Sequence, residues 1–160
     1  EDVFLSVSAT TRKPREGEVH GVNYFFASKE DFLKKVEEGG FLEYAEVFGN
    51  YYGTPKKYVE DQLSAGKNVI LEIEIQGALK IKKKFPETVL MFVATPSANI
   101  LKERLVGRGT DTEEAIERRV AKAASEMEFA AGKFDYVLVN DDLATAKAEA
   151  EKVIAGFLAE

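Results

Sequence analysis

The run VILEIEI at residues 69–75 decides the fold class of this chain. Its branched apolar residues are typical of a strand that is buried in a parallel sheet. The basic segment 78–85 predicts a helix, and the apolar run 89–94 predicts another buried strand. A strand, a helix and a second strand in this order indicate an α/β fold with a parallel sheet.

The same alternation continues to the end of the chain. We expect a helix opened by Ser97 that includes residues 100–106, a long charged helix at 113–130, a last strand at 136–139 and an amphipathic helix at 143–158.

The first part of the chain follows a different pattern. Its expected elements are strands at 3–8, 24–27 and 41–48 and helices from Ser28 to Gly39 and from Pro55 to Gly66. Short strands and single helices in succession do not continue the alternation of the later part. The stretch 10–66 is therefore predicted to be a lobe inserted into the α/β domain.

Composition limits the classes of protein that are possible. The chain has 160 residues, 45% of them hydrophobic, which suits one domain with a sizeable core. With 22 basic and 28 acidic residues the net charge is −6, which does not support binding to a nucleic acid polymer. One histidine and no cysteine exclude disulfides and thiolate metal sites. No run approaches the ~20 apolar residues of a membrane span.

A loop that could bind an anion follows the first expected strand. The run SVSATTRKPREGE at residues 6–18 places Arg12 and Arg15 on either side of Pro14, after several hydroxyl side chains. Pro14 disfavours a helix here, and guanidinium groups can each bind two oxygens of a phosphate or carboxylate. Taken alone, the run could also be a solvated Arg-Pro turn.

Several blocks in order make the chain resemble the guanylate kinases over nearly its whole length. They are residues 8–18, 23–26, 43–46, 49–55, 70–78, 103–110 and 139–142. The resemblance implies a parallel sheet of the P-loop NTPase type, flanked by helices, with an inserted α+β lobe that binds GMP and a short lid. It divides the chain into a core at 1–9, 67–106 and 121–160, a lobe at 10–66 and a lid at 107–120.

The family also has a P-loop, Gly-x-x-x-x-Gly-Lys-Ser/Thr, that holds the phosphates of ATP. No such motif occurs in these 160 residues. The chain begins where the family's second core strand begins, so we expect the first strand, the P-loop and the first helix to be missing from it. By itself the chain is then expected to be inactive and unstable, because a central strand of the sheet would be absent.

The resemblance assigns the phosphate of GMP to Arg12, Arg15, Tyr24 and Tyr52. The chemistry agrees, because a monophosphate carries close to two charges and tyrosine hydroxyls donate without adding charge. For Tyr52 the alternative is a plain aromatic turn at residues 51–53.

The resemblance assigns the guanine base to Glu43, Ser8 and Thr54. Guanine presents a ring N–H and an amino group side by side, which match one carboxylate, whereas adenine presents an acceptor at that ring nitrogen. The hydroxyls of Ser8 and Thr54 can serve the remaining base atoms. Without the resemblance, Glu43 would be read as a strand acid facing water.

Glu72 and Glu74 stand two apart, so they are expected on one face at the end of a core strand, where ligands bind in open α/β sheets. The resemblance gives them a role as base or magnesium-linked acids near GMP, although aspartate is common in the family at the second position. Two acids at the open end of a strand remain the alternative. No protein side chain is assigned as a metal ligand.

A third group of residues is expected to act on ATP. In the family, arginines that match Arg104, Arg108 and Arg119 reach the ATP phosphates and the phosphoryl group in transfer, and the residue that matches Asn140 contacts adenine. Arg108 lies between two glycines, which suits a loop that closes over substrate.

The resemblance therefore implies a cytoplasmic enzyme that transfers the γ-phosphate of ATP to GMP with Mg²⁺, without a nucleic acid or membrane partner and with no expectation for oligomeric state. Two other classes stay open. One is the guanylate-kinase-like interaction domain of scaffold proteins, which holds a phosphopeptide in the same cleft and needs no P-loop. The other is an unspecific phosphate-binding α/β domain, which leaves Glu43 and Thr54 unexplained.

Overall fold

The computed structural model describes residues 3–160, which form two compact units, one up to Pro86 and one from Glu87 to Glu160. Residues 1 and 2 of the expected core segment lie outside the described residues. Both units combine parallel strands with helices, so the predicted α/β class is confirmed. The division into core, lobe and lid stays a prediction.

The first unit begins with a short parallel pair. Strand β1 (Val3–Leu5) pairs with β6 (Asn68–Ile70), and the Ser6 amide donates to the carbonyl of Ile70 at 3.0 Å. The predicted strand 3–8 is too long, because the chain then changes partners and the Ser8 carbonyl accepts from the Phe25 amide at 2.8 Å.

A second sheet of the first unit has the order β3-β2-β5-β4. Its strands are β2 (Ala9–Thr10), β3 (Phe25–Phe26), β4 (Phe41–Val47) and β5 (Asn50–Pro55). Strand β5 was not predicted, and it rules out the aromatic turn at residues 51–53. A tight turn joins β4 to β5, in which Phe48 has φ 49° and Gly49 has φ 79°.

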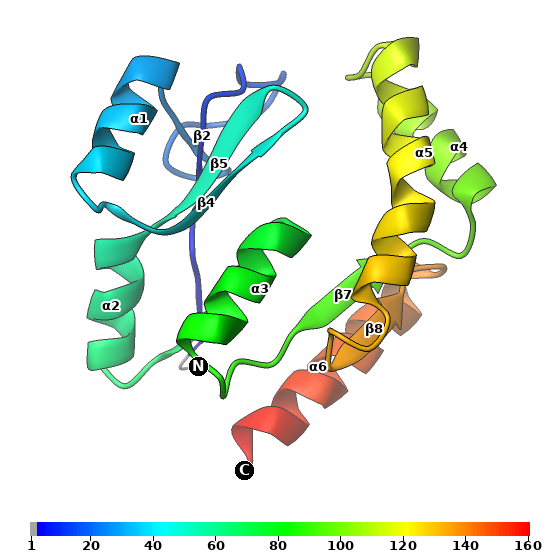
Figure 1. Cartoon of the computed structure of the whole chain (residues 1–160). Coiled ribbons are helices and arrows are strands. Elements are labelled where there is room, and N and C mark those ends of the chain that lie inside the picture. Colours follow the sequence, from blue (N-terminus) through cyan, green and yellow to red (C-terminus); the bar gives the residue numbers. More distant parts are fainter. Residues whose placement is uncertain (1–2) are drawn as a thin grey trace. The chain divides into compact units, whose positions relative to one another are not determined.

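Helix α1 (Lys29–Glu37) begins at the predicted cap, where the Ser28 side chain accepts from the Asp31 amide. Its Phe32 is buried and stacks on Phe41 and Tyr51, with ring centroids 4.4 and 5.5 Å apart. This packing needs a glycine at position 53, because a Cβ there would lie 2.8 Å from Phe41 and 3.0 Å from Phe32. Aromatic packing thus fixes α1 against the β4–β5 hairpin (Figure 1).

Helix α2 (Lys56–Ser64) follows Pro55, as predicted, and contributes to the apolar core of the unit. This core is made of Leu42, Val59 and Ile81, with partly buried neighbours Val69, Leu71, Ile73 and Phe85. It joins β4 to helix α3 (Ile75–Lys84) and therefore sets where α3 lies beside the hairpin.

The prediction for residues 69–85 needs a correction. Strand β6 ends at Ile70, and α3 begins at Ile75, earlier than expected. Strand β1 offers partners only as far as Leu5, which pairs with Ile70, so residues 71–74 are not in a ladder of the described sheet. Glu72 and Glu74 therefore do not share a strand face, and Glu74 is the N-cap of α3.

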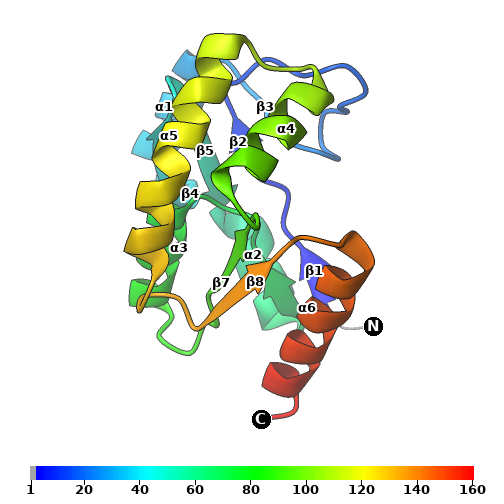
Figure 2. The ribbon, with the colours of Figure 1, turned by 90° about the vertical axis from the view of Figure 1, so that its right-hand side faces the viewer.

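The second unit contains a parallel pair and the remaining helices (Figure 2). Strand β7 (Met91–Ala94) pairs with β8 (Tyr136–Val139), and α6 (Leu143–Leu158) packs against β8. Helix α4 (Ala98–Arg108) packs against α5 (Glu113–Ala130), and Ser97 caps α4 as predicted. The predicted bounds of α5, β8 and α6 agree with those observed.

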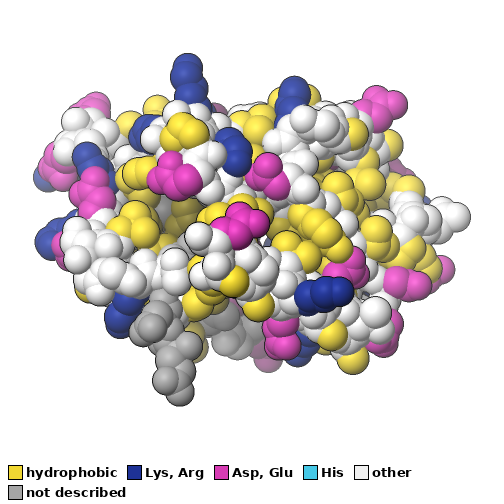
Figure 3. Space-filling view, turned by 90° about the horizontal axis from the view of Figure 1, so that it is seen from below, with side chains coloured by type: hydrophobic (Ala, Val, Ile, Leu, Met, Phe, Trp, Pro, Cys, Tyr) yellow, Lys and Arg dark blue, Asp and Glu magenta, His cyan; other side chains and the backbone are white. Residues whose placement is uncertain are grey.

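Both parallel pairs carry exposed apolar side chains. In the first unit these are Val3, Leu5 and Ile70, and in the second Val93, Val137 and Val139. Figure 3 shows apolar side chains among charged ones on one face of the molecule. Within residues 3–160 no helix is both long and apolar enough to cross a membrane.

Candidate functional site

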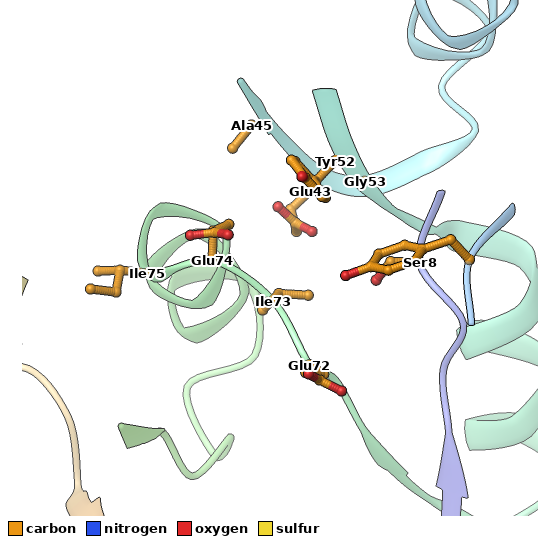
Figure 4. Close-up of a pocket in the computed structure, with 10 residues that line it drawn as sticks. Ser8, Glu43, Ala45, Tyr52, Gly53, Glu72, Ile73, Glu74 and Ile75 are labelled. Atoms are coloured by element: carbon orange, nitrogen blue, oxygen red, sulfur yellow. The ribbon is translucent and has the colours of Figure 1, made fainter. Parts of the chain in front are cut away.

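An open cavity of about 190 Å³ lies in the first unit (Figure 4). It is lined by side chains from β4, β5, the segment that follows β6 and the start of α3, together with Ser8 and Tyr24. Six of the nine predicted GMP residues line it, namely Ser8, Tyr24, Glu43, Tyr52, Glu72 and Glu74. Residues from distant parts of the sequence thus share one pocket.

Glu43 is the buried acid of this cavity, with only 6% of its surface exposed. It shares the inner face of β4 with Ala45 and Val47, so it does not face water as a strand acid would by default. The Thr54 hydroxyl donates to Glu43 Oε1 at 2.7 Å. Burial raises the pKa of Glu43, while the Thr54 hydrogen bond opposes that rise.

Of the residues predicted to bind phosphate, Tyr24 and Tyr52 line the same cavity, and Arg12 lies beside Tyr24 without lining it. The rings of Tyr24 and Tyr52 meet edge to face at 6.2 Å, and the Arg12 guanidinium lies 5.2 Å from the centre of the Tyr24 ring. Burial raises the pKa of Tyr24, and Glu72 adds to this rise through its charge. Tyr24 is therefore a hydroxyl donor throughout the neutral range.

Arg12 is held by a second acid of the same loop. Its Nη1 and Nη2 donate to Glu18 Oε2 and Oε1 at 3.0 and 2.9 Å, and the Arg15 amide donates to Glu18 Oε2 at 2.7 Å. The hydrogen bond with Glu18 is the leading cause of a raised pKa at Arg12. Predicted site residue Arg15 does not line the cavity, but its backbone belongs to this cluster.

Glu72 and Glu74 reach the cavity from the segment between β6 and α3. Glu72 is exposed and Glu74 is half-buried. In the part of the chain that the structure describes, no group of three or more His, Cys, Asp or Glu could hold a metal ion. These two carboxylates suit the way Mg²⁺ binds at phosphates, through one or two protein oxygens with the rest from substrate and water.

In the second unit, Arg104 and Asn140 are brought together. Arg104 on α4 donates from Nη1 to the Asn140 carbonyl at 2.5 Å and from Nη2 to the Asp141 carbonyl at 2.9 Å. Asn140 directly follows β8, and its own amide donates to the Ala94 carbonyl at 2.8 Å. The arginine therefore fixes the turn that presents the Asn140 side chain.

The two glycine neighbours of Arg108 predicted a loop, but Arg108 lies in a helix. It is the last residue of α4, the helix runs through Gly107, and only Gly109, with φ 67°, has the left-handed backbone that ends the helix. Arg108 pairs with Asp111 at 2.5 Å, and its side chain is 42% exposed. Arg119 lies on α5, which packs against α4.

Comparison with known proteins shows the family of this chain. The family model "Guanylate kinase" matches residues 1–156. The chain belongs to the guanylate kinase family. Family membership makes it a kinase, a nucleotide-binding transferase.

Curated guanylate kinases are similar over nearly the whole chain. The guanylate kinase of Synechococcus sp. (strain CC9311) is 53% identical over 151 residues, which are 94% of this chain and 79% of that protein. That of Caldanaerobacter subterraneus subsp. tengcongensis is 49% identical over 160 residues, 100% of this chain and 76% of that protein. The crystal structure of guanylate kinase from Anaplasma phagocytophilum is similar with a TM-score of 0.80 and 36% identity, over 97% of this chain and 76% of that one.

Two residues that contact predicted site residues, Glu18 and Gly77, were not predicted from the sequence. Glu18 was part of the Arg12 loop but had no assigned role, because loop spacing does not show which acid folds back on which arginine. Gly77 lies inside α3 and directly beside the carboxylate of Glu43. No signal in the sequence indicated this contact, because the helix was predicted to begin only at residue 78.

Removing the charge of Glu18 is expected to destabilise the fold and to flatten its acid response. The pKa of Glu18 is lowered to about 2, first by the Arg12 hydrogen bond. A lowered pKa means that the folded state binds fewer protons, so this stabilisation is present above about pH 4.5 and is lost as the pH falls toward 2. In Glu18→Gln, the free energy of unfolding at pH 7 should fall by about 1–3 kcal/mol.

Urea unfolding at pH 7 and at pH 3 measures both effects. The difference between wild type and Glu18→Gln should shrink at the lower pH. Glu16→Gln is the matched control, because Glu16 is an exposed acid of the same loop. Equal unfolding of wild type and Glu18→Gln at pH 7 would show that the Arg12 pair adds nothing to stability.

Proposed function

We propose that this member of the guanylate kinase family transfers the γ-phosphate of Mg-ATP to GMP. The observation that carries the proposal is the buried carboxylate of Glu43, fixed by Thr54 at the wall of a polar cavity. Burying an ionised acid is costly, and hydrogen-bond donors of a ligand would offset that cost. Guanine supplies a ring N–H and an amino group side by side, which two carboxylate oxygens can accept.

The tyrosines of the cavity wall, with the neighbouring arginine loop, suit the phosphate of GMP. Tyr24 and Tyr52 are assigned as hydroxyl donors, and Arg12 with Arg15 as the charged groups. The contacts of Arg12 with Glu18 and the Tyr24 ring hold its guanidinium in place before substrate binds. A cation that is already ordered loses little further conformational entropy when the phosphate arrives. Ser8, on the cavity wall, is assigned to the base together with Thr54.

On the ATP side, Arg104, Arg108 and Arg119 are assigned to the phosphates and Asn140 to adenine. Phosphoryl transfer has a loose transition state with charge spread over oxygens, so positive charge and positioning lower its barrier more than a strong base does. The Mg²⁺ that accompanies ATP would neutralise phosphate charge when bound. Glu72 and Glu74 are the acids that could orient its water ligands.

The test compares GMP with AMP in calorimetry of the whole protein, followed by an assay of GMP-dependent ADP release. We expect GMP to bind at least about tenfold more tightly than AMP, because AMP would leave Glu43 without its donors. Equal affinities would refute the assignment of Glu43. Tight binding of a phosphopeptide without any turnover of ATP and GMP would instead identify an interaction domain.

A further inference from the structure

Helix α3 meets β4 at Glu43 through a position that has no side chain. Gly77, in the first turns of α3, is buried, and a Cβ placed on it would lie 2.3 Å from Glu43 Oε2 and 2.7 Å from Glu43 Cδ. Non-bonded carbon and oxygen atoms do not approach so closely. The carboxylate of Glu43 therefore occupies the space that any side chain at position 77 would need.

Two lysines of the same helix hold the strand on either side of Glu43. Lys80 Nζ donates to the Tyr44 carbonyl at 2.7 Å, and Lys84 Nζ donates to the Leu42 carbonyl. Strand β4 is at the edge of its sheet, so these carbonyls point away from β5 and toward α3. Gly77, Lys80 and Lys84 follow one another at helical spacing and share this face of α3.

The carboxylate is thus fixed from both sides. From β5, Thr54 donates to Oε1, and from α3, the open surface at Gly77 receives Oε2. We propose that Gly77 is a specificity-determining position, which lets the Glu43 carboxylate lie against α3 in the orientation that accepts guanine, with Lys80 and Lys84 as positioning residues for the strand. This proposal rests on the proposed function of Glu43.

Changing Gly77 to alanine separates binding from folding. Alanine is a better helix former than glycine, and the three atoms nearest to the new Cβ all belong to the flexible Glu43 side chain. The clash is therefore relieved by moving the carboxylate, which costs the fold little. GMP affinity in Gly77→Ala should fall about tenfold, which corresponds to the loss of one charge-assisted hydrogen bond. The preference for GMP over AMP should fall with it. The melting temperature should stay equal or rise.

The experiment is a GMP and AMP titration of wild type, Gly77→Ala, Glu43→Gln and the double variant, each with a thermal melt. Gly156→Ala in α6 is the matched control, because a Cβ there meets nothing within 4 Å. If both residues act through one carboxylate, the double variant should bind GMP no more weakly than Glu43→Gln alone. Unchanged GMP affinity in Gly77→Ala, with Glu43→Gln weakened, overturns this inference alone. Unchanged affinity in Glu43→Gln overturns the proposed function.

Should Gly77→Ala fail to fold, Lys80→Met with Lys84→Met tests the same face of α3. Glu43 is faced by Thr54 from β5 and by Lys80, Lys84 and Glu74 from α3, and the two lysines lower its pKa while Glu74 raises it. Without the lysines, the loss of GMP affinity on acidification should begin at a higher pH, and Lys80→Arg with Lys84→Arg should restore it. An unchanged pH profile in the Met variant would contradict the positioning role.

Discussion

Replacing Arg108 with alanine is expected to lower kcat by on the order of a hundredfold or more, with a much smaller effect on the KM for GMP. The proposed partner of Arg108 is charge that develops on the phosphoryl group during transfer, so the loss falls on the transition state. Arg108 is paired with Asp111, but an ion pair with a 42% exposed arginine is worth little, and Arg108 can leave it at small cost.

Steady-state kinetics of the whole protein with ATP and GMP varied separately measure this prediction. Lys102→Ala is the matched control, because Lys102 is an exposed cation of the same helix with no assigned role. It should keep kcat within a few-fold of wild type. A raised KM for GMP together with a normal kcat in Arg108→Ala would mean that Arg108 binds GMP and does not act on the phosphoryl group in transfer.

The elements that could be predicted from the sequence are those whose own pattern determines them. Helix α5, strand β8 and helix α6 have strong periodicity or branched apolar runs, and their predicted bounds agree with the structure. Strand β5 was missed because Asn50–Pro55 contains a glycine and a proline and forms only by pairing with β4 and β2. The end of β6 likewise depends on its partner β1, which the run at 69–75 does not reveal.

The site divides in the same way. Residues with a distinctive chemical role in the family, such as Glu43, could be named from the sequence because the resemblance supplied that role. The burial of Glu43 could not be predicted from the sequence. Strand alternation defines two faces, and only the packing of α3 decides which face is covered. Glu18 and Gly77 depend on contacts between side chains and backbone that no spacing encodes.

Replacing Glu43 with glutamine is expected to weaken GMP binding by about 1–3 kcal/mol, which is roughly five- to 150-fold. Glutamine keeps the shape and one acceptor, but it turns the other oxygen into an amino group that faces the donors of guanine. AMP binding should change much less, so the preference for GMP should nearly disappear. Calorimetry with both nucleotides on wild type and Glu43→Gln measures this.

Unfolding would not explain this loss of GMP affinity, because the replacement of Glu43 is not expected to destabilise the fold at pH 7. Burial raises this pKa, so the folded state holds the proton more tightly than the unfolded state does. Its contribution to stability is present below the ordinary pKa of glutamate and is lost as the pH rises through the raised value. At pH 7 the buried Glu43 therefore costs stability relative to acidic pH, and Glu43→Gln should melt at the same or a higher temperature.

The same shift predicts how GMP binding depends on pH. Guanine needs the ionised carboxylate, so GMP affinity should fall on acidification at a higher pH than for an exposed glutamate, as Glu43 takes up its proton. The phosphate of GMP also titrates, with a second pKa of about 6, and weakens binding in the same direction. Glu43→Gln retains only the phosphate part, so subtracting its profile from that of wild type isolates Glu43. Identical profiles in the two proteins would show that Glu43 does not contact the base as a carboxylate.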